Sequence, residues 1–235
     1  MKKVIFSAAI LIVLILATGF STDQSDSKET RNVRNFTKVS FGVSGNLFIK
    51  LGTEFRLVIE GDKRVVDETV TEVSGDRLII KRENWRIRFD DERVTINITM
   101  PEIDGLGVSG SGKAQIMDEV KADNLNLSVS GSGKLLTAGL EVDNFHCGIS
   151  GSGDVVIGSG GSIDRGDISI SGSGGFSGEA VEIDHLNISV SGSGDCYCKV
   201  GDSLDASVSG SGNVTYLGNP RVNARVSGSG HVRSK

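Results

Sequence analysis

The four-residue motif Ser-Gly-Ser-Gly occurs seven times between residues 109 and 230 of this 235-residue chain. Its copies begin at Ser109, Ser130, Ser150, Ser171, Ser191, Ser209 and Ser227, at steps of 18 to 21 residues. Repetition at such a period is typical of solenoids, in which one repeat cannot bury its apolar face alone and neighbouring repeats stack to close a continuous core. The motif therefore predicts a stack of similar coils over residues 104–235.

Apolar and polar residues alternate on the way into every copy. The residue before the first serine is β-branched in all seven copies, an apolar residue stands three positions before that serine, and another stands five positions after it. This alternation indicates half-buried strands on both sides of the motif. A coil of about 18–21 residues has room for three short strands and three turns. We therefore predict an all-β fold, a right-handed parallel β-helix. The six-residue apolar period of left-handed hexapeptide helices is missing, and the variable step favours the right-handed form.

The motif itself is predicted to be a corner of each coil. Glycine tolerates positive φ angles and the close approach of stacked backbones, and serine can form hydrogen bonds locally or with the next coil. A phosphate-binding loop is the competing interpretation, but such a loop precedes a helix, whereas a β-rich run follows each copy here. The predicted corner residues are Ser109, Gly110, Ser130, Gly131, Ser150, Gly151, Ser171, Gly172, Ser191, Gly192, Ser209, Gly210, Ser227 and Gly228.

The first half of the chain is organised differently. Residues 1–19 combine two lysines, an apolar run and small residues, a pattern typical of a secretory signal peptide; an uncleaved anchor is the alternative. Residues 20–35 are polar and are predicted to be a flexible leader. Residues 36–103 contain strand-like runs at 41–51, 55–60, 77–81 and 94–100, and are expected to form the first coils or a cap, with a hairpin or exposed loop at 81–93. The expected location is outside the cytoplasm, in the periplasm, at the cell surface or in the medium, with no membrane span after cleavage.

Charge limits the classes of partner. The chain carries a net charge of −5, so it has no electrostatic basis for binding nucleic acid. A solenoid instead offers long, flat polar faces that suit a glycan or another protein of the envelope or of a host.

Three sets of residues together resemble a known family. They are the repeated corners, which continue into aspartate at Asp154 and Asp195, the segment 98–101 (Ile-Thr-Met-Pro) before the first copy, and the segment 216–220 (Tyr-Leu-Gly-Asn-Pro) before the last. In this order they resemble the auto-transporter adhesin head (GIN) domain family of exported bacterial proteins, over residues 36–232. The resemblance implies a right-handed β-helical fold, a cell-envelope or surface setting, and no catalytic residues. The chain departs from lipid-anchored relatives because Phe20 stands where a lipoprotein would have its cysteine.

An acidic residue stands seven positions before the first serine in six copies. In a stack, these carboxylates would form a column with one acid per coil, about 5 Å apart, and would repel one another. A turn role, in which aspartate accepts hydrogen bonds from backbone amides, is one explanation; a row of Ca²⁺ sites is the other. The column consists of Glu102 followed by the candidate calcium ligands Asp123, Asp143, Asp164, Asp184 and Asp202. No other cofactor is expected.

Cysteine and histidine residues suggest no further chemistry. Cys147, Cys196 and Cys198 stand in columns that other copies fill with apolar residues, so we predict that they are small buried hydrophobes. His146 falls in a column of outward-facing polar residues. No Ser/His/Asp arrangement can be placed, and no catalytic residue is assigned.

We therefore expect a non-catalytic, adhesin-like binding module that recognises a glycan or a protein through a solenoid face. The alternatives are a structural envelope component and, third, a polysaccharide-degrading β-helix enzyme, which would need a pair of acids set across a glycosidic bond.

Overall fold

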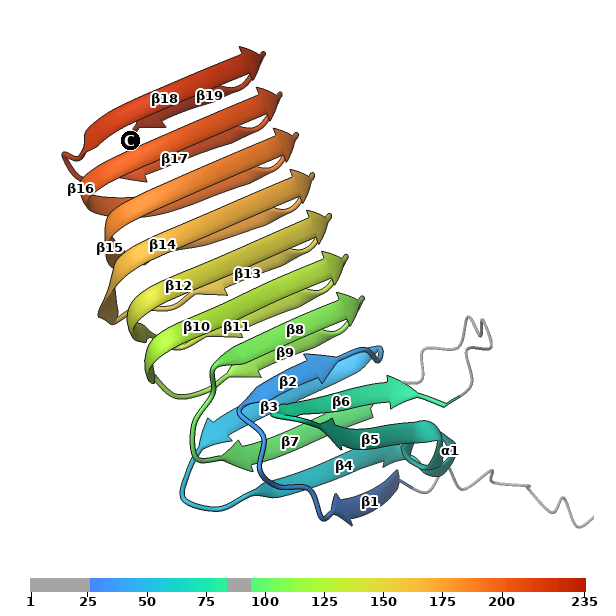
Figure 1. Cartoon of the computed structure of the whole chain (residues 1–235). Coiled ribbons are helices and arrows are strands. Elements are labelled where there is room, and N and C mark those ends of the chain that lie inside the picture. The colour runs from blue at the N-terminus through green and yellow to red at the C-terminus, as the bar shows by residue number, and fades with distance from the viewer. Residues whose placement is uncertain (1–25, 84–93) are drawn as a thin grey trace, which may run out of the picture.

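The computed structural model of the chain describes residues 26–83 and 94–235. The predicted signal peptide, the first part of the predicted leader and most of the 81–93 loop lie outside these residues. The fold is all-β, with 74% strand and 3% helix. Figure 1 shows a stack of coils above a smaller group of strands from the N-terminal half.

The repeats form the stack. Each coil has one long strand at the front and one short strand behind it, and the two merge into a single strand in β15 and β16 (Figure 1). The front strands run from left to right, the chain returns behind them, and each coil lies above the one before, so the helix is right-handed. The strands are β8 (Gly105–Gly110), β9 (Lys113–Ile116), β10 (Val120–Gly131), β11 (Lys134–Thr137), β12 (Leu140–Gly151), β13 (Asp154–Ile157), β14 (Gly161–Gly172), β15 (Gly175–Gly192), β16 (Asp195–Gly210), β17 (Asn213–Leu217), β18 (Arg221–Gly228) and β19 (His231–Ser234).

Successive repeats pair in parallel and in register. Ser130 of β10 lies beside Ser109 of β8 on one side and Ser150 of β12 on the other, and the same alignment continues to β18. The predicted parallel β-helix is confirmed. The register is fixed because a slip by one residue would turn every buried side chain of a strand outward.

The long strands bend once, and the bend divides them into two faces. Pairing between β10 and β12 passes from Ala122–Val142 directly to Asn124–Asn144, so that Asp123 drops out of the ladder. The corresponding residue is also skipped between β12 and β14. Differences in repeat length are absorbed between the short strand and the bend: β15 and β16 shift register between Gly178 and Glu182 and again between Ile183 and His185, while the pairing through the Ser-Gly corner stays regular.

The stack continues into the N-terminal half. Here β2 (Lys38–Phe41) pairs in parallel with β8 and β6 (Arg77–Arg82), and β3 (Gly45–Leu51) pairs in parallel with β9 and β7 (Val94–Met100). Antiparallel strands then end the stack: β4 (Arg56–Asp62) pairs with β7, and β5 (Thr69–Ser74) pairs with β6.

One short helix accompanies this end. Helix α1 (Lys63–Glu68) begins at Asp62, whose side chain accepts a hydrogen bond from the backbone N–H of Arg64 at 2.9 Å. Val65 and Val66 of the helix are buried. The predicted strand runs correspond to β3, β4, β6 and β7, and the first run reaches only the last residue of β2. The rest of β2, β5 and α1 had no signal strong enough to be predicted.

The assignment of residues 20–35 to a flexible leader is corrected for its second half. β1 (Asp26–Arg31) pairs antiparallel with β4, from Asp26–Asp62 to Arg31–Leu57. This strand has no apolar face of its own. It is held by main-chain hydrogen bonds to the edge of β4 and by an ion pair between Lys28 and Glu60 at 2.6 Å, which apolar periodicity does not reveal.

The core is a set of aliphatic columns inside the coils. Leu127, Cys147, Ile168 and Ile188 form one column, and each is at most 3% exposed. Phe145 and Phe176 pack with their ring centroids 6.1 Å apart. All three cysteines are buried and unpaired, as predicted. Among the residues described, no helix has the length and hydrophobicity needed to cross a membrane.

Candidate binding groove

Two outward-facing polar columns lie side by side just after the bend. Between them runs a buried apolar column that includes Leu125, Phe145 and Leu186. The alternation of a strand places the flanking residues on the outer surface. The first column is Asn124, Asn144, Arg165, His185 and Ser203, and the second is Asn126, His146, Asp167, Asn187 and Asp205.

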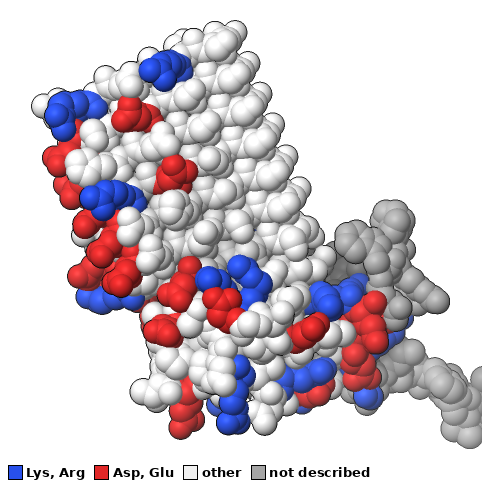
Figure 2. Space-filling model, in the orientation of Figure 1, with Lys and Arg blue, Asp and Glu red and all other residues white. Residues whose placement is uncertain are grey.

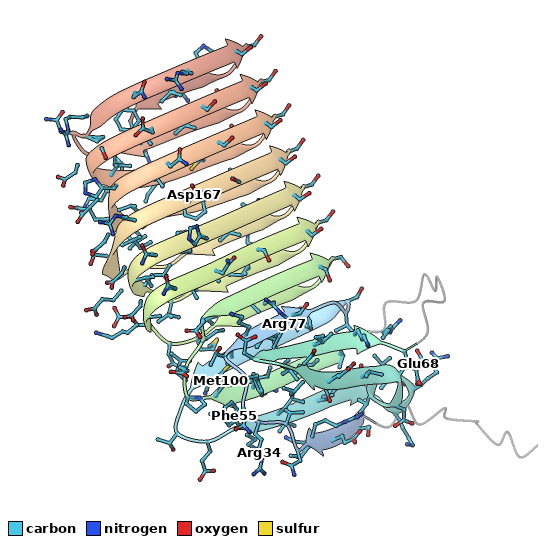
Figure 3. All side chains as sticks on the ribbon, viewed as in Figure 1. Arg34, Phe55, Glu68, Arg77, Met100 and Asp167 are labelled. Atoms are coloured by element: carbon cyan, nitrogen blue, oxygen red, sulfur yellow. The ribbon has the colours of Figure 1, made fainter. Side chains whose placement is uncertain are left out.

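These columns border two hollows that meet at His146. One has a volume of about 580 Å³ and reaches from Lys38 and Asp104 to His146. The other, of about 320 Å³, continues from His146 to Asp205. Phe145, Gly166 and Leu186 lie between its polar walls. We call the two hollows together the flank groove. It follows the stacking axis across several coils, and Figure 3 places Asp167 on β14 near the middle of the stack.

Hydrogen bonds between coils hold part of the groove wall in place. The Asn187 amide donates to a carboxylate oxygen of Asp167 at 2.8 Å, and Asn223 donates in the same way to Asp205 at 2.7 Å. His185 Nδ1 lies 3.0 Å from the Ser203 hydroxyl, and its Nε2 lies 3.9 Å from an oxygen of Asp202. Repeated Asp–Asn pairs thus present fixed acceptors and donors to solvent.

Two cationic or proton-donating groups of the groove keep their hydrogen-bonding capacity. Within residues 26–83 and 94–235, Arg165 and His146 are exposed, and neither forms a hydrogen bond or ion pair. A guanidinium and an imidazole therefore face the groove beside the Asp–Asn pairs. This mixture of fixed amides, carboxylates and free donors can bind a polar, hydroxyl-rich ligand.

The acidic column lies at the bend, next to the groove. Asp123, Asp143, Asp164 and Asp202 are exposed, and Asp184 is half-buried. In the described parts of the chain, only the Asp202 carboxylate among these five has a polar side-chain partner, His185. Figure 2 shows acidic side chains gathered along this edge of the stack. Lys121, paired with Glu141 and Glu119, supplies a local counter-charge, and these carboxylates raise its pKa.

A third hollow, of about 410 Å³, adjoins the column and includes Asp123, Asp143 and Asp164 in its lining. Nowhere in the described structure, however, do three or more His, Cys, Asp or Glu side chains converge as a set that could hold a metal ion. The acids are spread one to a coil. Calcium binding by the column stays a prediction.

The Ser-Gly corners lie at the opposite end of the front strands. The first glycine of each copy has a positive φ, from 89° at Gly110 to 122° at Gly228. In Gly151, an added Cβ would lie 2.6 Å from the carbonyl oxygen of Gly131 in the coil below. The first serines are exposed, and the visible face of the stack away from the acidic edge carries almost no charge (Figure 2).

The alternation of the sequence placed His146 in an outward polar column, which in the structure continues through Asp167, Asn187 and Asp205, but it did not predict the groove. The neighbouring column, which contains Arg165 and His185 and forms the other wall of the groove, was not predicted. Its signal is the pair of consecutive outward residues at each bend, such as Asp123 and Asn124, which interrupts the alternation and creates the concavity.

Fold and surface together define a class: a β-solenoid of stacked repeats with an open polar groove along one flank. Residues 35–220 match the family described as "Putative auto-transporter adhesin, head GIN domain", and the chain belongs to this family. The family expected from the repeated corners is thereby confirmed.

Several solved structures share the fold. A putative adhesin from Bacteroides fragilis is 23% identical, with a TM-score of 0.84, over 90% of this chain and 98% of that one. A putative adhesin from Parabacteroides distasonis is 21% identical, with a TM-score of 0.75, over 91% and 98%. A protein of the same species described as a putative lipid binding protein is 20% identical, with a TM-score of 0.73, over 89% and 96%. No curated protein matches the chain.

Proposed function

We propose that this protein is an exported, non-catalytic binding module that recognises a glycan along the flank groove. The observation that carries the proposal is the continuity of the two hollows, which share His146; the second is also walled by the cross-coil pair of Asp167 and Asn187. Sugar hydroxyls both donate and accept hydrogen bonds, and fixed amide and carboxylate groups suit both roles. Because the groove is open along the side of the stack, it suits an internal segment of a long chain.

Two further observations support this setting. Residues 1–19 have the pattern of a secretory signal, and the family is named for adhesins, which act outside the cytoplasm. A binding role by many weak polar contacts also fits a rigid solenoid, whose columns place a polar side chain at the same position of each coil.

The test is a panel of host and bacterial polysaccharides incubated with the protein purified without residues 1–19. Retention of the protein and release of reducing or unsaturated sugar ends are both measured. Retention without product supports the proposal. Product would instead favour the polysaccharide-degrading enzyme, and neither signal would favour a structural envelope role.

A matched pair of variants locates the site. Asp167→Ala removes the acceptor of an Asp–Asn pair in the groove, and we expect it to weaken glycan binding about tenfold or more. Asp195→Ala removes the acceptor of a similar pair, in which the Asn213 amide donates at 2.9 Å, from the other face of the coil. This control should bind as the unmodified protein does. Equal loss in both variants would contradict a site in the groove.

A further inference from the structure

The two ends of the stack are finished differently. At the N-terminal end, antiparallel strands β1, β4 and β5 and helix α1 accompany the last parallel strands (Figure 1). At the other end, among the strands that the structure describes, β18 pairs only with β16 and β19 only with β17. Figure 1 shows no strand above them. Within residues 26–83 and 94–235, one edge of each of these two strands therefore has no paired strand to accept or donate its backbone hydrogen bonds.

The apolar columns are also uncovered at this end. Val222 is 41% exposed and Val226 is 44% exposed, whereas Leu204 and Val208, their neighbours in the coil below, are 0% and 1% exposed. A further strand would continue the ladder and cover both valines.

The positive charge of this end favours an acidic partner. No aspartate or glutamate follows Asp205 in the chain, while Arg221, Arg225 and Arg233 lie on the outward faces of β18 and β19. Within the described residues, none of these three arginines forms a hydrogen bond or an ion pair. The last coil is thus a basic edge on a chain of net charge −5.

We infer that the β18–β19 end binds an extended acidic segment of a partner protein as an additional strand. Main-chain hydrogen bonds to β18 would provide affinity, as in other cases of strand addition. Apolar residues of the segment would cover Val222 and Val226, and alternate acidic residues would lie opposite Arg221 and Arg225. A second copy of this chain fits poorly, because its own arginines would meet like charges.

The probe is a synthetic, end-blocked seven-residue peptide of alternating glutamate and valine. A lysine–valine peptide of the same length is the control, and binding is measured by calorimetry at low and high salt. We expect the glutamate peptide to bind, the lysine peptide not to bind, and the affinity to fall with salt. Equal binding of both peptides, or binding of neither, would overturn the inference.

Variants tie the binding to this end. In Arg221→Glu/Arg225→Glu, affinity for the glutamate peptide should fall about tenfold or more, and the lysine peptide should now bind. The matched control is Lys113→Glu/Lys134→Glu, which reverses two exposed cations on the back of the stack and should leave binding unchanged. A second copy of the chain is the other possible occupant of this end, and sedimentation measures whether the unmodified protein forms a dimer. A dimer that dissociates in the arginine variant would overturn the inference in favour of a second copy.

Discussion

At the scale of single residues, glycine at the corner does what no other residue can do there. The positive φ of the first glycine and the carbonyl of the preceding coil leave no room for a side chain. Because the coils are in register, the positive φ recurs at the first glycine of every copy, and the carbonyl of the preceding coil excludes a side chain in every copy after the first. This explains why the motif recurs while its neighbours vary.

Gly151→Ala should lower the free energy of unfolding by about 2–4 kcal/mol, because it combines an unfavourable φ of 107° with a contact of 2.6 Å to the Gly131 carbonyl. Urea unfolding measures the change. Gly148→Ala is the control: this glycine lies in the same strand, and an added Cβ meets nothing within 4 Å. A Gly148→Ala loss as large as that of Gly151→Ala would show that the corner has no special role.

The buried thiols predict a dependence on pH. Burial raises the pKa of Cys147, and a hydrogen bond with Cys198, together with burial, raises that of Cys196. A thiol whose pKa is higher in the folded state stabilises the fold fully below its unfolded pKa of about 8.5, and this contribution is lost as pH rises above that value. Above that pH, each such thiol lowers the free energy of unfolding by about 1.4 kcal/mol per pH unit.

Cys147→Val should therefore lose less stability than the unmodified protein between pH 7.5 and 9.5, by about 1.4 kcal/mol, measured by urea unfolding under reducing conditions. Valine suits the position because Leu127 and Ile168 flank it in the column. Parallel losses in both proteins would contradict the assignment. A thiol reagent should also find no reactive cysteine until the protein unfolds.

At the scale of elements, the bend of the long strands decides where function can lie. It takes one residue per coil out of the ladder in β10, β12, β14 and β15, and two in β16, and in each of these five coils an aspartate is left out. The bend also creates the concavity of the flank groove beside the acids. Repulsion within the acidic column is the cost of this arrangement, moderated by solvent and by Lys121.

The column gives a test of calcium binding. In calcium-free buffer at low salt, Asp143→Asn should raise the Tm slightly, because it removes one of the mutually repelling charges. If the column binds calcium, millimolar Ca²⁺ should raise the Tm of the unmodified protein more than that of the variant, and Mg²⁺ should not replace it. No shift with millimolar Ca²⁺ would contradict calcium binding.

At the scale of the whole molecule, stability should vary along the stack. Within the described part of the chain, coils in the middle are paired on both sides and β18 and β19 on one side only, while antiparallel strands cover the N-terminal end. In solenoids, stability is approximately a sum of repeat and neighbour contributions. The C-terminal coil has half of the usual neighbours.

Hydrogen exchange should therefore be faster for amides of 221–228 than for those of 203–210, which occupy the same positions one coil below. The N-terminal strands β6 and β7 should exchange more slowly than β18, because antiparallel partners cover them. Uniform protection from 203 to 228 would mean that the last coil unfolds only together with the rest.

Much of this fold follows from local pattern. Alternation into Ser-Gly-Ser-Gly at a nearly constant step was sufficient to predict parallel coils, the core columns and buried cysteines, because in-register stacking is the arrangement that buries all those residues together. The strands and the helix of residues 36–103 were predicted less completely. Strand β1 has no apolar face and is held by β4, a strand distant in sequence. Strand β5 and helix α1 are short, and β5 is held by its hairpin partner β6, so neither has a long apolar pattern of its own.

The sequence by itself determined the solenoid, its corners and its acidic column, since each is a periodic property of neighbouring residues. Only the tertiary structure decided that Arg165 and His185 border the same groove as Asp167, and that the valines of β18 are uncovered. The shape of the groove depends on where each strand bends. The exposure of the valines at the end of the stack depends on which strands lack a neighbour. Both arise from contacts between coils, which a single repeat does not contain.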